Sequence, residues 1–141
     1  MKTGQAIVEI VIAFAVATIA VLAMVQVATK SLSNAGAAKR AAQATAYAME
    51  GMEWVTGQRD LNTWSIFTGK SGNYCISLLP ADWLAMTITG TCGGVVISGT
   101  EFSRYVNLTP SGNRDAVTVT VSWYEGSRLT DESTSSEFTA Y

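Results

Sequence analysis

Hydrophobic residues fill the first part of the chain almost without interruption, and a helical and then a strand-like pattern follows. Residues 10–25 contain no charged side chain, and extending this stretch to residues 6–28 adds a single charge, Glu9. As an α-helix rising 1.5 Å per residue, residues 6–28 would be about 35 Å long, enough to cross a bilayer core of about 30 Å. The pattern therefore predicts one transmembrane helix near the N-terminus.

The helix is predicted to continue beyond this apolar segment. Residues 28–56 are rich in Ala and contain no Pro. Residues at spacings of three and four would form one helical face, namely Ala41, Ala44, Ala48, Met52 and Val55. We expect one helix over residues 5–57, with an amphipathic second half. Gly36 and Gly51 would weaken it, because Gly in a helix costs up to about 1 kcal/mol relative to Ala.

Period-two alternation replaces the helical spacing after residue 57. The clearest predicted strand covers residues 117–123, and Glu125-Gly126 predicts a turn into a partner strand that starts at Arg128. Shorter strands are predicted around residues 74–78, 84–88, 95–97, 102–108 and 137–141. Residues 58–141 should therefore form an antiparallel sheet with one wet face. The predicted fold class is α+β, with the C-terminal half of the long N-terminal helix packed on an antiparallel β-sheet.

Composition and charge disfavour several classes of function. A length of 141 residues suits about one domain. The net charge of −2 gives no basic footprint for nucleic acid. The sequence has no His, which removes Ser-His and Cys-His nucleophile pairs and His-based metal sites. It also lacks a Gly-rich phosphate loop, an HExxH motif and paired CxxC motifs. We expect no catalytic residues, no metal and no cofactor.

The two cysteines, Cys75 and Cys92, both follow the apolar segment. If that segment crosses a membrane, the domain after it lies outside the cytosol, where two cysteines favour a disulfide over two buried thiols. The disulfide would close a loop of about 18 residues and contribute about 3 kcal/mol to the free energy of unfolding in the chain-entropy model.

The tryptophans and a group of carboxylates could each form a binding surface, but an ordinary structural role is favoured for both. A carbohydrate surface or, as we expect, core and anchoring positions would involve Trp54, Trp64, Trp83 and Trp123. Asp115, Asp131 and Glu132 could bind calcium, but they lack EF-hand spacing. We expect these carboxylates in solvated loops.

Two further residues on the predicted strand of residues 102–108 carry possible signals. Asn107 begins an N-glycosylation sequon, Asn-Leu-Thr, but its position within a strand gives the sequon little weight. Arg104 is expected to face outward, with its aliphatic stem over apolar neighbours. No site is assigned to either residue.

The N-terminus has a distinctive arrangement of charge. A cationic stub ends at Gly4, and Glu9 follows five residues later, inside the start of the apolar segment. A charge within a membrane span costs about 2.5–3.5 kcal/mol on insertion scales, so it usually has a function. The combination resembles the N-terminus of type IV prepilins and pseudopilins, whose common pattern is Gly-Phe-Thr-Leu-Ile/Val-Glu. Here the matching residues are Gly4-Gln5-Ala6-Ile7-Val8-Glu9.

The resemblance extends past the apolar segment. The stretch from Ala44 to Val55 is similar to the Ala-rich, Leu-Ala-x-Glu-Gly-Leu-Glu helix end of minor pilins and pseudopilins. Gln5 stands where Phe is usual, and the helix lacks the Pro of many major pilins. Both Pro residues, Pro80 and Pro110, come later. The missing helix Pro favours a minor pilin or pseudopilin over a principal filament subunit.

The resemblance implies a type IV pilin-like fold and a specific processing event. Residues 1–4 would be a leader that a prepilin peptidase removes between Gly4 and Gln5, followed by methylation of the new Gln5 amine. Glu9 would then pair with the cationic N-terminus of a neighbouring subunit, where opposite charges offset each other's desolvation. Without such a role, Glu9 would be protonated in the membrane or would reach its edge.

The implied function is that of a structural subunit of a type IV pilus or a type II secretion-like filament. Its partners would be other pilin or pseudopilin subunits, the peptidase, and an inner-membrane assembly platform with its ATPase. The chain would cross the inner membrane once before assembly and then enter an extracellular or periplasmic filament. The alternative is a single-pass, membrane-anchored binding or adhesion module that forms no filament, and only the filament subunit requires cleavage after Gly4. An anchored enzyme is disfavoured by the absence of His.

Overall fold

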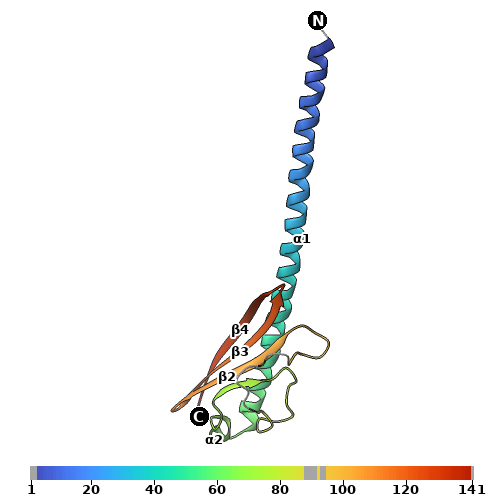
Figure 1. Cartoon of the computed structure of the whole chain (residues 1–141). Coiled ribbons are helices and arrows are strands. Elements are labelled where there is room, and N and C mark those ends of the chain that lie inside the picture. The colour runs from blue at the N-terminus through green and yellow to red at the C-terminus, as the bar shows by residue number, and fades with distance from the viewer. Residues whose placement is uncertain (1–2, 88–91, 93–94, 141) are drawn as a thin grey trace. The chain divides into compact units, whose positions relative to one another are not determined.

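The computed structural model describes residues 3–87, 92 and 95–140, with side chains from residue 7 onward. A long helix, α1 (Thr3–Leu61), is followed by a short helix, α2 (Trp64–Phe67). Four strands follow: β1 (Gly72–Cys75), β2 (Ser103–Ser111), β3 (Arg114–Glu125) and β4 (Arg128–Thr139). The sheet has the order β1-β2-β3-β4, and every neighbouring pair is antiparallel (Figure 1). The α+β class and the antiparallel sheet are as predicted.

The chain divides into two structural units between Arg40 and Ala41, and α1 contributes to both. Helix residues before the division have almost no buried side chains, whereas the helix residues after it supply part of a hydrophobic core. The division therefore falls where the helix begins to pack against the sheet, and not where the helix ends.

The amphipathic half of α1 buries the face that its spacing predicts. Ala44, Ala48 and Val55 are at most 1 % exposed, and Ala41 and Met52 pack at the rim of the two hydrophobic clusters. Small Ala side chains on this face let the helix backbone approach the strands closely. The prediction that the second half of the helix packs on the sheet is confirmed.

The helix ends at Leu61, four residues beyond the predicted limit of residue 57. Gly57 is exposed, with open space where a side chain would lie, so nothing stops the helix there. Gln58, one position later, is buried. The last turn is closed by Asn62, whose backbone N–H and side-chain Nδ2 both donate to the Gln58 carbonyl oxygen, at 3.1 and 2.7 Å.

Two tight hairpins build most of the sheet. Residue pairs Ser111↔Arg114 and Glu125↔Arg128 flank two-residue turns whose first residues, Gly112 and Gly126, have φ of 61° and 65°. Because only the first turn residue has a positive φ, the pattern is that of the type II′ turn that suits the twist of a hairpin. The second turn is the one predicted from the sequence.

The strand after the second turn is longer than predicted. β4 pairs with β3 in unbroken register from Arg128 to Thr139, so residues 137–139 of the separate strand expected at 137–141 belong to one continuous element; Ala140 follows the strand, and Tyr141 lies outside the described residues. β4 reads as interrupted in the sequence because Ser, Thr and acidic residues dominate it. Its pairing with β3, and not its own hydrophobicity, keeps it extended.

The segment between β1 and β2 departs most from the predicted strands. β1 ends at Cys75, and no strand forms at residues 84–87 or 95–97; Ile88, at the end of the first of these predictions, lies outside the described residues. Leu84 is 68 % exposed, while Trp83 and Met86 are buried. Burial here follows individual anchoring side chains and not alternation, so the predicted period-two pattern was accidental.

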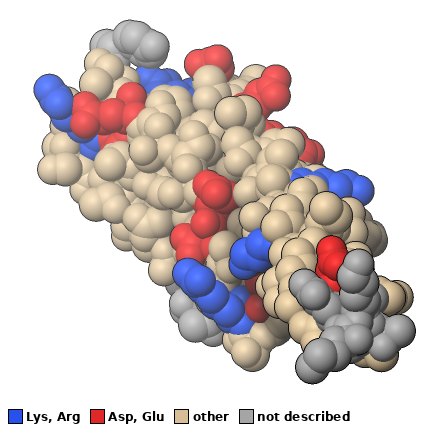
Figure 2. Space-filling model, turned by 90° about the horizontal axis from the view of Figure 1, so that it is seen from above, with Lys and Arg blue, Asp and Glu red and all other residues tan. Residues whose placement is uncertain are grey.

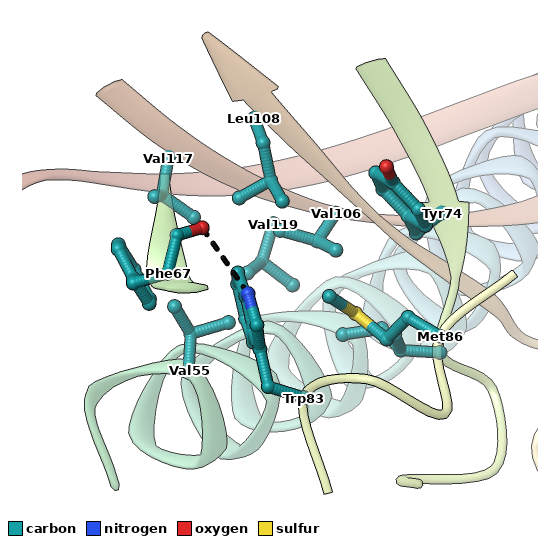
Figure 3. Packing of buried hydrophobic residues seen from close by; sticks show 10 residues of the cluster. Val55, Phe67, Tyr74, Trp83, Met86, Val106, Leu108, Val117 and Val119 are labelled. Atoms are coloured by element: carbon teal, nitrogen blue, oxygen red, sulfur yellow. Dashed lines mark hydrogen bonds between the residues drawn. The ribbon is translucent and has the colours of Figure 1, made fainter. Parts of the chain in front are cut away.

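Trp83 is the centre of this anchoring. Its ring stacks on Phe67 with centroids 4.5 Å apart, and its Nε1–H donates to the Phe67 carbonyl oxygen at 3.1 Å (Figure 3). The same cluster contains Val55 of α1 and Val119 of β3. One indole thereby joins the irregular segment, α2, the end of α1 and the sheet into a single core.

Candidate assembly surface and buried charges

Residues 7–28 of α1 present an apolar surface that nothing in the described part of the chain covers. Their large hydrophobic side chains are 54–72 % exposed. The hydroxyl of Thr18 donates to the Phe14 carbonyl oxygen at 2.6 Å, and that of Thr29 donates to Val25 at 3.0 Å. Such internal hydrogen bonds suit surroundings that lack water. By length and composition, α1 is the one helix among the described residues that could cross a membrane.

Glu9 interrupts this surface near its start. It is the only charged residue between Lys2 and Lys30, and its side chain is exposed. No ion pair in the described part of the chain includes it. The backbones of Gly4 and Gln5 lie in the first turns of α1, but the Gln5 side chain is outside the described side chains. Glu9 thus has no ion-pair partner among the described residues, and its pairing with a neighbour's N-terminus stays a prediction.

Arg104, predicted to face outward, is buried at 2 % exposure. Its Nε–H donates to the Ile76 carbonyl oxygen at 3.1 Å, and its Nη1 donates to the Tyr47 carbonyl oxygen at 2.9 Å and to Glu50 Oε2 at 2.8 Å. The prediction was wrong because carbonyl groups and a carboxylate from α1 and the irregular segment surround the guanidinium. The signal was present in the sequence, because Arg104 alternates in step with the buried Val106 and Leu108 of β2 and with Phe102 just before the strand.

Gly51 makes room for this arginine. A Cβ atom at Gly51 would lie 2.9 Å from Arg104 Cδ and 2.9 Å from Val119 Cγ1. Both distances are shorter than carbon atoms tolerate, and the hydrogen bonds of Arg104 hold its side chain in place. The glycine that looks like a weak point of the helix is therefore what allows the helix to lie against β2 and β3.

The predicted disulfide is present in the structure between Cys75 and Cys92, whose Cα atoms are 5.6 Å apart. Cys75 is the last residue of β1, and Ile76 next to it accepts the hydrogen bond from Arg104. The Ser77 hydroxyl donates to the Val95 carbonyl oxygen at 2.9 Å, on the far side of Cys92. The disulfide and these hydrogen bonds together tie both ends of the loop to the sheet.

The tryptophans occupy the core positions that were expected. Trp83 and Trp123 are at most 2 % exposed, and Trp54 and Trp64 pack against the larger cluster. Trp54 also donates its Nε1–H to the Pro80 carbonyl oxygen at 3.1 Å. No row of exposed indoles is therefore available for a carbohydrate among the described residues.

The carboxylates do not lie in solvated loops, and that expectation was wrong. Asp131 and Glu132 are in β4, and Asp115 is in β3, because the hairpin is longer than the sequence suggests. Asp115 pairs with Phe138, whereas Asp131 pairs with Ser122, seven positions farther along β3. Among the residues that the structure describes, no group of three or more His, Cys, Asp and Glu side chains could hold a metal ion.

Asp115 has the most unusual electrostatic environment of the described residues. Its side chain is fully buried, and neither carboxylate oxygen has a hydrogen-bond partner of ordinary geometry. Burial raises the pKa of Asp115 from 3.8 to about 6, partly offset by the nearby Thr109 backbone. Its neighbours across the sheet are Pro110, which has no N–H, and Phe138. The pKa is raised because burial outweighs the one nearby backbone donor, Thr109.

The sequon residue Asn107 lies within β2, and its Nδ2 donates to Asn73 Oδ1 of β1 at 2.8 Å. On the face drawn in Figure 2, Lys and Arg atoms are interspersed with Asp and Glu atoms, and no wide area carries a single sign of charge. Neither feature marks a binding site.

Comparison of the chain with protein-family models, curated proteins and solved structures finds no match.

Proposed function

We propose that this chain is a structural subunit, a minor pilin or pseudopilin, of a type IV pilus or a type II secretion-like filament. The observation that carries the proposal is the apolar surface of residues 7–28, which nothing among the described residues covers, with one exposed carboxylate, Glu9, close to its N-terminal end. An apolar surface of this extent in a folded chain needs a membrane or another protein to cover it. A filament subunit uses both in turn.

The membrane stage is supported by the length and composition of the segment. In the filament stage, the same helix surface would pack against the helices of neighbouring subunits and form an apolar core. The charge of Glu9 costs free energy both in the membrane and in the apolar core of the filament unless an opposite charge pairs with it. The cationic amine of a neighbouring subunit, created by cleavage before Gln5, supplies that partner.

The second unit suits a role outside the membrane. Its disulfide is stable in an oxidising compartment, and its sheet packs on α1 through Arg104 and the Ala face of the helix. We propose a pilin-like relationship between this helix and sheet, with a prepilin peptidase and an assembly platform with its ATPase as partners. The proposal assigns no reaction to the chain itself.

The experiment is intact-mass analysis of the protein purified from its native membrane. The expected mass lacks Met1 to Gly4 and carries one methyl group on Gln5. A Gly4→Leu variant should remain at full length, because a side chain at the scissile position would crowd the peptidase cleft. Wild-type protein that retains its first four residues would refute the proposal and favour the anchored binding module.

Assembly is tested separately with Glu9→Ala, and Glu9→Gln serves as a variant of similar size. Membrane insertion should be unchanged or easier, because a costly charge is removed. Incorporation into sheared filaments should fall for both variants, because the neighbouring amine is left unpaired. Equal incorporation of wild type and both variants would show that Glu9 has no role in assembly.

A further inference from the structure

One edge of the sheet is open and long. β4 is the last strand in the order β1-β2-β3-β4 and pairs only with β3 in the described part of the chain. It has 12 residues in unbroken one-to-one register, without a bulge. The opposite edge strand, β1, has only 4 residues and ends at the disulfide. Short edge strands resist pairing with other chains, so the two edges of this sheet differ in kind.

The register shows which backbone groups of β4 point away from the sheet. Glu125 and Arg128 flank a two-residue turn and therefore form a hydrogen-bonded pair. Hydrogen-bonded and non-hydrogen-bonded pairs alternate along the two strands. The backbone N–H and C=O groups of the even-numbered residues of β4 therefore bond to β3, and those of the odd-numbered residues point away from the sheet, toward its open edge. Thr139 agrees with this assignment, since its carbonyl oxygen accepts a hydrogen bond from Arg59 Nη2 at 3.3 Å. Arg59 thus marks one end of the open edge.

Natural edge strands usually carry charged side chains, above all Lys, or Pro or a bulge, that prevent further pairing. Between Leu129 and Glu137, β4 has no Lys, Pro or bulge, and its charged residues, Asp131, Glu132 and Glu137, are all acidic, so they oppose an acidic strand but not a basic one. The side chains of Ser133 to Ser136 are short and uncharged, so a strand could approach them without a steric or electrostatic barrier. The side chain of Glu132, opposite Val121, lies on the face of the sheet that packs on α1 elsewhere, but it is exposed and α1 does not cover it.

The charges of this edge define the chemistry of its partner. Asp131 and Glu132 are exposed neighbours at one end of the uncharged stretch. At the other end, Glu137 is already paired with Arg114 at 2.8 Å. The edge therefore has two acidic side chains, one on each face of the sheet, that an added strand with Lys or Arg would neutralise.

We propose that the outer edge of β4, from Leu129 to Glu137, binds an extended basic segment of another polypeptide by strand addition. The outward N–H and C=O groups of the odd-numbered residues would supply the backbone hydrogen bonds. Asp131 and Glu132 would select for Lys or Arg at neighbouring positions of the partner, which face opposite sides of the extended sheet. This role is compatible with a filament subunit and with an anchored binding module alike.

The probe is a synthetic peptide about ten residues long, to match an edge of this length, made of Thr with two adjacent Lys residues, so that one Lys lies on each face of the extended sheet. The full chain in detergent micelles is titrated with it, and amide hydrogen exchange of β4 is followed. We expect the amides of Asp131, Ser133 and Ser135 to exchange at no more than about one tenth of their rate without peptide, because they become hydrogen-bonded. The same peptide with Glu in place of both Lys residues is the charge control and should give no protection.

Two proline variants separate edge binding from folding. Ser133→Pro removes an outward N–H and should abolish protection by the Lys peptide while the thermal midpoint stays close to wild type. Thr134→Pro is the matched control, because it removes an N–H that bonds to β3 and should lower the thermal midpoint. Asp131→Asn and Glu132→Gln should each weaken binding about two- to fivefold.

Three results would overturn the proposal. Equal protection by the Lys and Glu peptides would rule out a preference for a basic partner. Unchanged binding by the Ser133→Pro variant would rule out binding by strand addition. Protection that rises with protein concentration alone, without peptide, would assign the edge to a second copy of this chain. Absence of protection at saturating Lys peptide would show that the edge is closed.

Discussion

Replacing Asp115 by Asn should change how the stability of the second unit depends on pH. The folded protein binds the Asp115 proton more tightly than the unfolded chain, since the pKa rises from 3.8 to about 6. The contribution of this group is therefore fully present below about pH 4 and is lost as the pH rises through about 6. Above that range the ionised carboxylate is buried without a partner, and the free energy of unfolding is lowered.

The size of the effect follows from the shift of about two pKa units. Each unit corresponds to about 1.4 kcal/mol, so the loss between pH 4 and pH 8 is about 3 kcal/mol at most. An Asn side chain keeps the shape and cannot ionise. Because its own burial cost is the same at both pH values, the informative quantity is the change in the difference between variant and wild type. That change should favour Asp115→Asn by about 2–3 kcal/mol at pH 8 relative to pH 4.

The assay is urea unfolding of the full chain in a non-ionic detergent at pH 4, 6 and 8, followed by tryptophan fluorescence. The buried Trp83 and Trp123 should report unfolding of the core. Asp131→Asn is the matched control, because its carboxylate is exposed and its removal should change the pH dependence by less than about 0.5 kcal/mol. If wild type and Asp115→Asn show parallel pH profiles, the carboxyl group is not desolvated and the reasoning fails.

Three further changes test the contacts that hold α1 on the sheet and the disulfide that ties the loop after β1. Arg104→Ala should lower the free energy of unfolding by about 2–3 kcal/mol in a urea melt, since buried acceptors lose their donor; Arg114→Ala removes an exposed ion pair and should cost less than about 1 kcal/mol. Gly51→Ala should destabilise by about 1–3 kcal/mol through overpacking, whereas Gly57→Ala, at an open helix position, should stabilise by about 0.5–1 kcal/mol; equal effects at the two glycines would contradict the close contact. Reduction of the disulfide should cost about 3 kcal/mol and lower the thermal midpoint, and an unchanged midpoint would show that the loop is held by its other contacts alone.

The elements with a strong local signal were predictable from the sequence. The apolar segment, the spaced Ala face of α1 and the alternating valines of β3 each repeat with the period of their element, and burial follows that period. The Glu125-Gly126 turn was also predictable, because a positive φ at this position requires Gly. Weak or irregular patterns failed: the segment between the cysteines showed a chance alternation, and β4 showed almost none.

The buried charges were not predictable in the same way. The parity of Arg104 in β2 indicates an inward position, but its acceptors come from Tyr47, Glu50 and Ile76, which are distant along the chain. Gly51 shows the same limit, since a glycine that weakens an isolated helix here makes room for a side chain from another element.

By itself, the sequence determined the helix, its apolar segment with Glu9, the disulfide-forming cysteines and the antiparallel hairpin, because each depends on residues that are close together or on simple periodicity. Only the tertiary structure decided that Arg104 is inside, that Asp115 is a buried acid, and that β4 is a long open edge. These three properties depend on which groups of other elements come near, and on which do not. Burial and hydrogen bonding are relations between distant parts of the chain, and no local pattern encodes them.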